Sequence, residues 1–262
     1  MRKSSFLFAL VLSFSIQMSF AHTNTMDVDD NDFISFADQR VKTICVNNWD
    51  ANEDGELSYG EAKAVTSLEK SFMSNKFILS FNELQYFTGL KIISNSAFYC
   101  CLSLEHITIP EGVTTIGEES FYGCENLMTV NVPTTLKDIR PWAFYGCGLL
   151  SDFVFPESMK SIGASAFVEC KNLKSITIPS GVESIGGGCF RGCSGLNSIV
   201  VDAANKTYNS ANNCNAIISN STGVLIAGCS STLIPNSANY IDDYAFSGLT
   251  ELTNIIIPNS VI

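Results

Sequence analysis

The chain has 262 residues, of which 46% are hydrophobic and 16% are charged, a composition typical of a globular protein with a substantial core. Acidic residues outnumber basic ones by 26 to 15, and the formal net charge at pH 7 is −11. This charge repels phosphate groups, so the composition argues against nucleic acid or an anionic membrane as a partner and favours cations.

Residues 1–21 are predicted to be a cleaved secretory signal. Arg2 and Lys3 precede an apolar run, and the segment ends in Ser19, Phe20 and Ala21, with small residues at the two positions that a signal peptidase inspects. No cysteine stands at the cleavage junction, so a lipid anchor is not expected. We expect a secreted or cell-surface protein with no membrane span once the signal is removed.

Residues 22–76 are predicted to form a small helical segment around an EF-hand-like calcium loop. Residues 50–61 read D-A-N-E-D-G-E-L-S-Y-G-E, which fits the loop pattern at every diagnostic position. Apolar residues from Phe33 to Trp49 recur at helical spacing, and a capping box of Ser58 and Glu61 begins a second helix. The predicted Ca²⁺ ligands are Asp50, Asn52, Asp54, the backbone carbonyl of Glu56, Ser58 and Glu61.

This segment resembles dockerin modules, which carry two calcium loops. Only one such loop is recognised in this segment, so a cohesin partner is not expected. An unpaired loop binds calcium weakly, with a Kd of roughly 10⁻⁴–10⁻³ M, as in extracellular modules. A structural role is therefore favoured, in which Ca²⁺ locks the two helices that cover the first repeat.

Residues 77–262 are dominated by a repeat of 23 residues. Each repeat has a phenylalanine, then a cysteine three residues later, a leucine six residues later, and an apolar pair that most often precedes a proline. A period of this length is typical of a stacked solenoid, in which each coil buries its apolar side against its neighbours. The repeating pairs are Phe98 with Cys101, Phe121 with Cys124, Phe144 with Cys147, Phe167 with Cys170, and Phe190 with Cys193.

One half of each repeat alternates as a strand does. Leu104, Ile107 and Ile109 are expected to point inward, while the residues between them point outward. The outward face has few charges and many hydroxyl and amide groups, which suits a protein partner; the alternative is an ordinary solvated sheet. The predicted partner-binding positions are His106, Thr108, Thr129, Asn131, Asp152, Val154, Ser175, Thr177, Ser198 and Val200.

The repeat resembles the BspA-like leucine-rich repeats of bacterial surface proteins. Residues 161–179, which read S-I-G-A-S-A-F-V-E-C-K-N-L-K-S-I-T-I-P, match that unit at almost every framework position, and the resemblance extends from about residue 84 to the end. The resemblance implies a leucine-rich-repeat solenoid, with a parallel sheet on one side and short helical or turn segments on the other. It also implies an exported protein that adheres to host matrix proteins or to other cells.

The pattern changes after Phe190. The next framework phenylalanine is Phe246, so residues 202–235 are predicted to be an enlarged unit, and the last repeat is incomplete at Ile262. Two short apolar runs around residues 220–223 predict a hairpin. If it is symmetric, Cys214 faces Cys229, which makes this pair the best candidate for a disulfide. The repeated cysteines face the interior, where buried free thiols are favoured.

The sequence does not indicate an enzyme. Its only histidines are His22 and His106, and no nucleophile motif accompanies them. Three functions remain open. The favoured one is a protein-binding or adhesion module with a structural calcium site. The others are a calcium-dependent assembly module and a non-catalytic fragment of a larger secreted protein.

Overall fold

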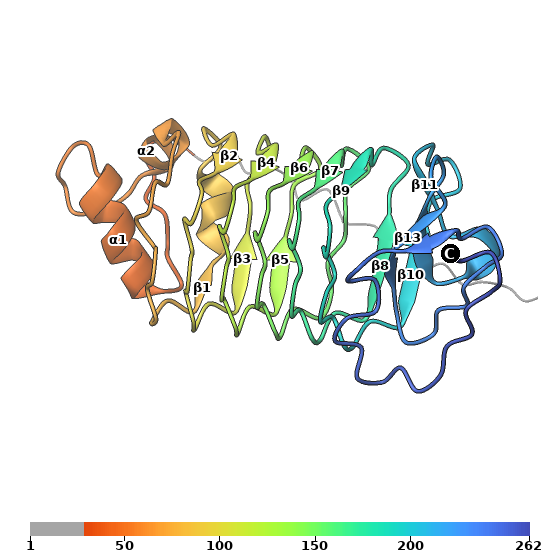
Figure 1. Cartoon of the computed structure of the whole chain (residues 1–262). Helices are drawn as coiled ribbons and strands as arrows, with labels where there is room; N and C mark the ends of the chain where they lie inside the picture. Colours follow the sequence, from red (N-terminus) through yellow and green to blue (C-terminus); the bar gives the residue numbers. More distant parts are fainter. Residues whose placement is uncertain (1–28) are drawn as a thin grey trace, which may run out of the picture.

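The computed structural model describes residues 29–262, so the predicted signal at 1–21 lies outside the described residues. The chain forms an elongated stack of coils with a small helical cap at its N-terminal end (Figure 1). The cap contains α1 (Gln39–Trp49) and α2 (Tyr59–Ala64). Asp38 caps α1, and Ser58 caps α2 in the predicted capping box with Glu61. The cap is followed by β1 (Ser80–Phe81) and the 3-10 helix η1 (Asn82–Tyr86), which lead into the stack.

The coils form two runs of parallel strands, whereas the repeat pattern predicted one parallel sheet. The first run, on the predicted binding face, contains β1, β3 (His106–Thr108) and β5 (Thr129–Asn131), and after a break β8 (Ser175–Ile178) and β10 (Ser198–Val201). The second run contains β2 (Ile92–Ile93), β4 (Thr115–Ile116), β6 (Asp138–Ile139), β7 (Ser161–Ile162) and β9 (Ser184–Ile185). Within the repeats a residue pairs with the one 23 positions later, as in His106 with Thr129 and Thr115 with Asp138, whereas Ser80 of β1 pairs with His106.

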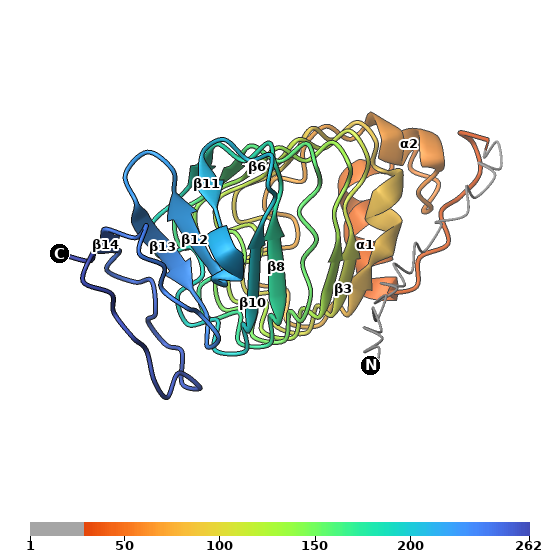
Figure 2. The same cartoon turned by 90° about the vertical axis from the view of Figure 1, so that its right-hand side faces the viewer.

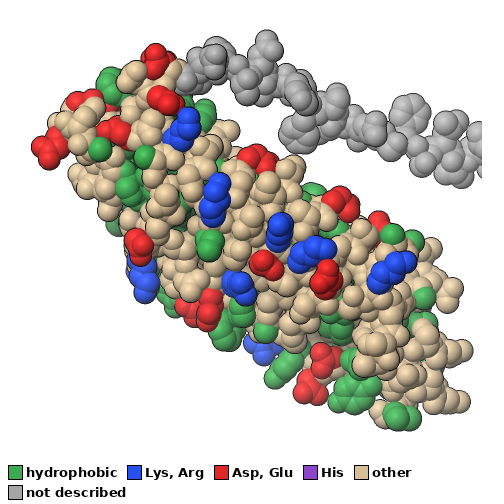
Figure 3. All heavy atoms as spheres, turned by 90° about the horizontal axis from the view of Figure 1, so that it is seen from above, with side chains coloured by type: hydrophobic (Ala, Val, Ile, Leu, Met, Phe, Trp, Pro, Cys, Tyr) green, Lys and Arg blue, Asp and Glu red, His purple; other side chains and the backbone are tan. Residues whose placement is uncertain are grey.

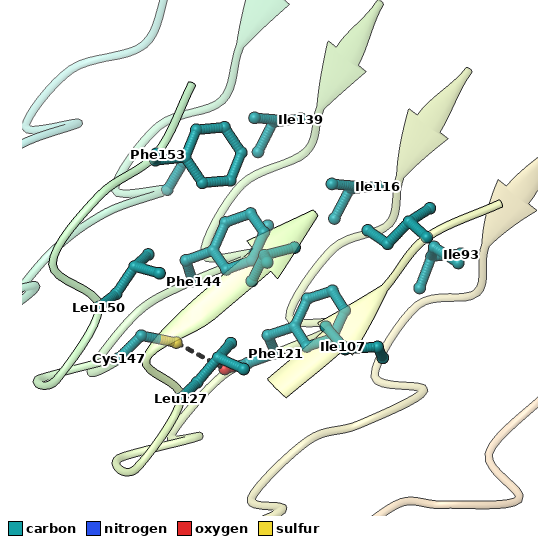
Figure 4. Packing of buried hydrophobic residues seen from close by; sticks show 14 of the residues in the cluster. Ile93, Ile107, Ile116, Phe121, Leu127, Ile139, Phe144, Cys147, Leu150 and Phe153 are labelled. Carbon is teal, nitrogen blue, oxygen red and sulfur yellow. Dashed lines mark hydrogen bonds between the residues drawn. The ribbon is translucent and has the colours of Figure 1, made fainter. Parts of the chain in front are cut away.

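The repeated phenylalanines form one column of stacked rings through the core. Neighbouring rings lie 5.1–5.6 Å apart between centroids, and each pair is nearly parallel. Figure 4 shows Phe121 and Phe144 in this arrangement. Phe72 adds a ring 5.2 Å from Phe98 at the cap end, so the stacked core begins before residue 77. The column confirms the predicted register of the repeat.

The repeated cysteines form a second column beside the rings. Each Sγ donates a hydrogen bond of 3.0–3.2 Å to the carbonyl oxygen of the phenylalanine one coil earlier. Figure 4 shows the bond from Cys147 to Phe121. Burial raises the pKa of Cys101 and of Cys193 to about 12, so both thiols stay protonated and can donate. As predicted, these cysteines are buried free thiols.

The enlarged unit lies at the C-terminal end of the stack, next to β10 (Figure 2). It contains β11 (Tyr208–Asn209), the 3-10 helix η2 (Ala211–Asn213), β12 (Ala216–Ser219) and β13 (Val224–Gly228), and it is followed by β14 (Tyr240–Ile241). The predicted hairpin is the antiparallel pair β12–β13. The stack resumes after it, because the amide of Gly192 donates to the carbonyl of Ser247 at 2.8 Å.

Cys214 and Cys229, the best candidate pair for a disulfide, are both free thiols in the structure. The reason is the hairpin register. Ile218 pairs with Leu225, but Ala216 pairs with Gly228, because the register shifts by one residue between Ile217 and Ile218. Such a bulge shifts the pairing of all residues between it and the open end of the hairpin by one position. The two cysteines are therefore not directly opposite each other, as the symmetric hairpin had predicted.

Candidate binding face and calcium loop

All ten predicted binding positions are half-buried or exposed. At the cap end of the face, polar side chains on successive coils bond to one another. His106 Nδ1 lies 2.8 Å from the hydroxyl of Thr129, and the amide of Asn131 donates to Thr108 Oγ1 at 3.1 Å. Thr108 donates in turn to Asn82 Oδ1 at 3.2 Å. These bonds make the cap end of the face a fixed polar row.

The face is interrupted between β5 and β8. Residues 152–155 form no strand, and among the described residues the peptide groups of Phe153, Val154 and Phe155 make no hydrogen bond. Phe153 and Phe155 occupy the inward positions and pack edge-on against the ring of Phe167, at 5.0 and 5.6 Å. These rings are larger than the isoleucine and valine side chains at the same positions of other coils. Their size keeps the backbone of residues 153–155 too far from β5 and β8 to form the strand hydrogen bonds.

The interruption leaves a hollow on the face. Its volume is about 260 Å³, and its lining includes Asp152, Val154, Glu157 and Thr177. The side chain of Val154 is 77% exposed beside it. Further along the face Val200 on β10 is also exposed, among the hydroxyl side chains of Ser175, Thr177 and Ser198. The predicted positions are therefore brought together in two parts, a bonded polar row and a mixed part that holds two exposed valines and the unpaired backbone of residues 153–155.

The predicted calcium loop lies between α1 and α2. Gly55 has a φ of +85°, a conformation that glycine adopts without strain. Asp50 Oδ2 accepts from the amide of Gly55, and Asp54 Oδ1 accepts from the amide of Glu56, at 2.8 and 2.9 Å. Asp50 Oδ1 is buried and has no hydrogen-bond partner within the described chain. An oxygen of this kind is unfavourable unless a donor or a cation meets it, so it fits the predicted ion.

Glu61, the last predicted ligand, folds back over the loop. Its carboxylate accepts from the amides of Ala51 and Ser58, each at 2.9 Å, and from the Ser58 hydroxyl at 2.8 Å. Burial alone would raise the pKa of this carboxyl, but the hydrogen bonds from Ser58, Ala51 and Asn52 outweigh that effect and lower it. Glu61 is therefore anionic at neutral pH, as a calcium ligand must be.

The remaining ligand oxygens come from several residue types. The carboxylate of Glu56 is paired with Lys42 at 2.6 Å, so only its backbone carbonyl is available to an ion. Within residues 29–262, no three His, Cys, Asp or Glu side chains converge closely enough to form a metal cluster by themselves. The ligand oxygens for Ca²⁺ would therefore come from Asn52, Ser58 and the Glu56 carbonyl as well as from carboxylates. Ca²⁺ is commonly bound by such a mixture of oxygen ligands.

The charges on the surface are mixed. Figure 3 shows acidic side chains at the cap end and acidic, basic and apolar side chains interspersed along the stack. Within the described residues no helix has the length and apolar character that crossing a bilayer would need.

The parallel coils, the ring column and the outward strand face together define a repeat protein of the leucine-rich solenoid class. A family model described as "BspA type Leucine rich repeat region" matches six copies, over residues 91–218 and 227–262. This match covers more than half of the chain. The chain belongs to the BspA-type leucine-rich repeat family.

Solved structures of bacterial proteins are similar to this chain. A leucine-rich repeat protein from Eubacterium ventriosum is 25% identical over 66% of this chain and 47% of its own, with a TM-score of 0.58. A leucine rich cell surface protein from Faecalibacterium prausnitzii has the same fold at 24% identity, over 74% and 58% of the two chains, with a TM-score of 0.53. A Treponema pallidum leucine rich repeat protein is 37% identical over 42% and 51% of the chains, with a TM-score of 0.42. The chain spans about half the length of such structures. A comparison with curated proteins gives no match.

Two features of the coils were not indicated by the periodicity. One is the second run of parallel strands, each of which has two residues and is too short to show an alternating pattern in the sequence. The other is the interruption at 152–155. A signal for it was present, because this coil carries phenylalanine at both inward positions, where the neighbouring coils have isoleucine or valine.

Proposed function

We propose that this chain is a secreted or cell-surface module that binds partner proteins, such as matrix proteins or proteins of another cell, with the strand face of its solenoid. The observation that carries the proposal is the mixed part of that face, where Val154 is exposed at the hollow of residues 152–155 and Val200 is exposed on β10. Protein interfaces combine an apolar centre with a polar rim. The row from His106 to Asn131 provides polar groups next to these exposed valines. The family and the predicted signal support an exported location.

Capture on immobilised matrix proteins tests this role. The face variant carries Asn131→Glu, Val154→Glu and Thr177→Glu, which place charges across the exposed row without touching the core. The control carries Ser184→Glu, an exposed position in β9 of the other run of strands. We expect the face variant to lose at least tenfold in capture and the control to keep it. Undiminished capture by the face variant would show that the strand face is not the binding surface.

We also propose a structural calcium site in residues 50–61, supported by the unpartnered oxygen of Asp50. The ion would be held by Asp50, Asn52, Asp54, Glu56 through its carbonyl, Ser58 and Glu61. Its positive charge would offset the mutual repulsion of these carboxylates and hold the end of α1 against the start of α2. In the alternative, a calcium-dependent assembly module, the loaded loop would itself contact a partner.

Calorimetric titration of the full chain with Ca²⁺ tests the site. We expect a Kd of roughly 10⁻⁴–10⁻³ M, lost in Asp50→Ala and in Glu61→Ala. Glu53→Gln is the matched control, because Glu53 is exposed and occupies a loop position that supplies no ligand. An unchanged titration of Asp50→Ala would contradict the site. Loss of partner capture by Asp50→Ala, with the melting temperature unchanged, would favour the assembly alternative.

A further inference from the structure

Residues 27–38 repeat the pattern of the calcium loop. Aligned on residues 50–61, they place Asp or Asn at the first, third and fifth positions, an apolar residue at the eighth, Ser at the ninth and Asp at the twelfth. The two segments lie 23 residues apart. The first copy departs from the pattern at its sixth position, where Asp32 replaces glycine. Its first residue, Asp27, lies outside the described residues.

The two copies pair through their backbones. The amide of Ile34 donates to the carbonyl of Leu57 at 2.8 Å, so the eighth positions of the two copies lie side by side. Phe33 and Ser58 form an antiparallel bridge, and the amide of Gly60 donates to the carbonyl of Asp30 at 2.8 Å. Ile34 and Leu57 are both buried. The calcium loop is therefore backed by a partner segment, which its sequence alone did not indicate.

The last carboxylate of the first copy has a different use from that of the second. Glu61 accepts from amides of its own loop. Asp38 instead caps α1 through Oδ1, which accepts from Arg40, and its Oδ2 accepts from the amide of Leu79 at 2.7 Å. Next to it, the amide of Ala37 donates to Glu83 at 2.8 Å. Leu79 and Glu83 belong to the segment that begins the solenoid, so this carboxylate anchors the cap to the stack.

We propose that the first copy binds no calcium and instead transmits calcium binding from residues 50–61 to the first coil of the solenoid. This inference rests on the calcium site proposed above. An ion that binds only the ordered loop stabilises every contact that the ordered loop requires. Those contacts run from Leu57 to Ile34, and from Ile34 along four residues to Asp38 and its bond with Leu79. Calcium thus strengthens the junction between cap and stack, and each chain binds one ion.

Amide hydrogen exchange of the full chain, with and without Ca²⁺, tests the link alongside the titration. We expect one ion per chain and at least tenfold slower exchange at Leu79 when Ca²⁺ is present. Asp38→Asn keeps the size and the helix cap but removes one of the two acceptors. It should still bind one ion, yet lose the calcium effect at Leu79. Asp32→Asn, an exposed change in the same segment, is the control and should behave as the wild type does.

The outcomes separate the two proposals, and the wild-type result alone is decisive if Asp38→Asn does not fold. Protection by Ca²⁺ confined to residues 50–61 would overturn the link and leave the calcium site intact. Two ions per chain, reduced to one by Asp38→Asn, would show that the first copy is itself a metal site and overturn the inference. No calcium binding at all would remove the site, and the link with it.

Discussion

The coils between Phe98 and Phe190 and the segment after residue 202 are built from the same repeat but hold together differently. In the first region each ring stacks on the ring of the next coil and each repeated thiol bonds to the coil before it. In the second region the hairpin β12–β13 lies between the two framework phenylalanines. Phe246 packs against the backbone of Gly228, and its ring is half-buried rather than part of the column.

The difference shows what the 23-residue period contributes. A side chain in the regular region contacts its own equivalent one coil away, so every favourable contact is repeated along the stack. After Phe190 the hairpin is inserted before the next equivalent coil, so side chains there no longer contact their own equivalents. The backbone still continues the stack, because the amide of Gly192 bonds to the carbonyl of Ser247. We expect core changes to be more severe in the regular region.

The largest effect is expected for Phe144→Ala, in the middle of the column. Phe144 is fully buried and has ring neighbours on both sides, so its removal should lower the free energy of unfolding by about 3–5 kcal/mol. Phe246→Ala should have a smaller effect. Urea unfolding of both variants measures the difference, and equal losses would contradict the distinction between the two regions.

Two neighbouring glycines provide a sharper test of coil spacing. A Cβ on Gly186 would collide with the backbone of Ala164 in the preceding coil, whereas a Cβ on Gly187 would meet no atom within 4 Å. Gly186→Ala should therefore lower the stability by about 1–3 kcal/mol or more, and Gly187→Ala should change it by less than about 0.5 kcal/mol. Thermal melting of the pair checks this. Similar melting temperatures would mean that adjacent coils are not in close contact here.

The thiol column should contribute less than the rings. Cys147→Ala removes one of the two donors to the buried carbonyl of Phe121, which keeps the amide of Cys124, so the change should cost about 0.5–1.5 kcal/mol. Cys147→Ser keeps a donor and should recover part of this loss. Cys214→Ala should cost less than Cys147→Ala, because the sulfur of Cys214 lies 3.9 Å from its acceptor in Ala216. Equal losses at the two positions, measured by urea unfolding, would exclude a special role for the column.

At neutral pH the last effect is absent, because it is a loss of stability that appears only in alkali. Burial raises the pKa of Cys101 and Cys193 to about 12 in the folded chain, whereas an unfolded thiol has a pKa of about 8.5. Between these values the unfolded chain binds fewer protons than the folded one, so stability falls as the pH rises. The melting temperature should be level below about pH 8 and decline towards pH 11. A Cys101→Ala, Cys193→Ala variant should decline less, and an identical decline would rule out these thiols as the cause.

The regular region could be predicted from the sequence because one period determines several contacts at once. The ring column, the free thiols and the outward positions of the strand face all follow from it, and the family match confirms the class of fold. The calcium ion, the exported location and the protein partner remain predictions. Residues 152–155 were not predicted, because Phe153 and Ile107 are equally apolar and only their sizes differ.

Local irregularities limited the prediction elsewhere. A one-residue shift between Ile217 and Ile218 was enough to misalign Cys214 and Cys229. The first copy of the calcium loop was missed because Asp32 stands in place of glycine and its role depends on a backbone bond to Leu57. Contacts of this kind depend on the path of the chain and leave little trace in residue type.

The bonds of the thiol column all run in one direction, from each coil to the one synthesised just before it. Each carbonyl also accepts from the amide three residues later in its own coil, so the thiol of the next coil is a second donor that ties the two coils together. The column therefore has a polarity along the stack. It ends at Cys193, because Leu249 stands where the next cysteine would be, and the carbonyl of Phe190 receives no thiol bond from the coil that follows.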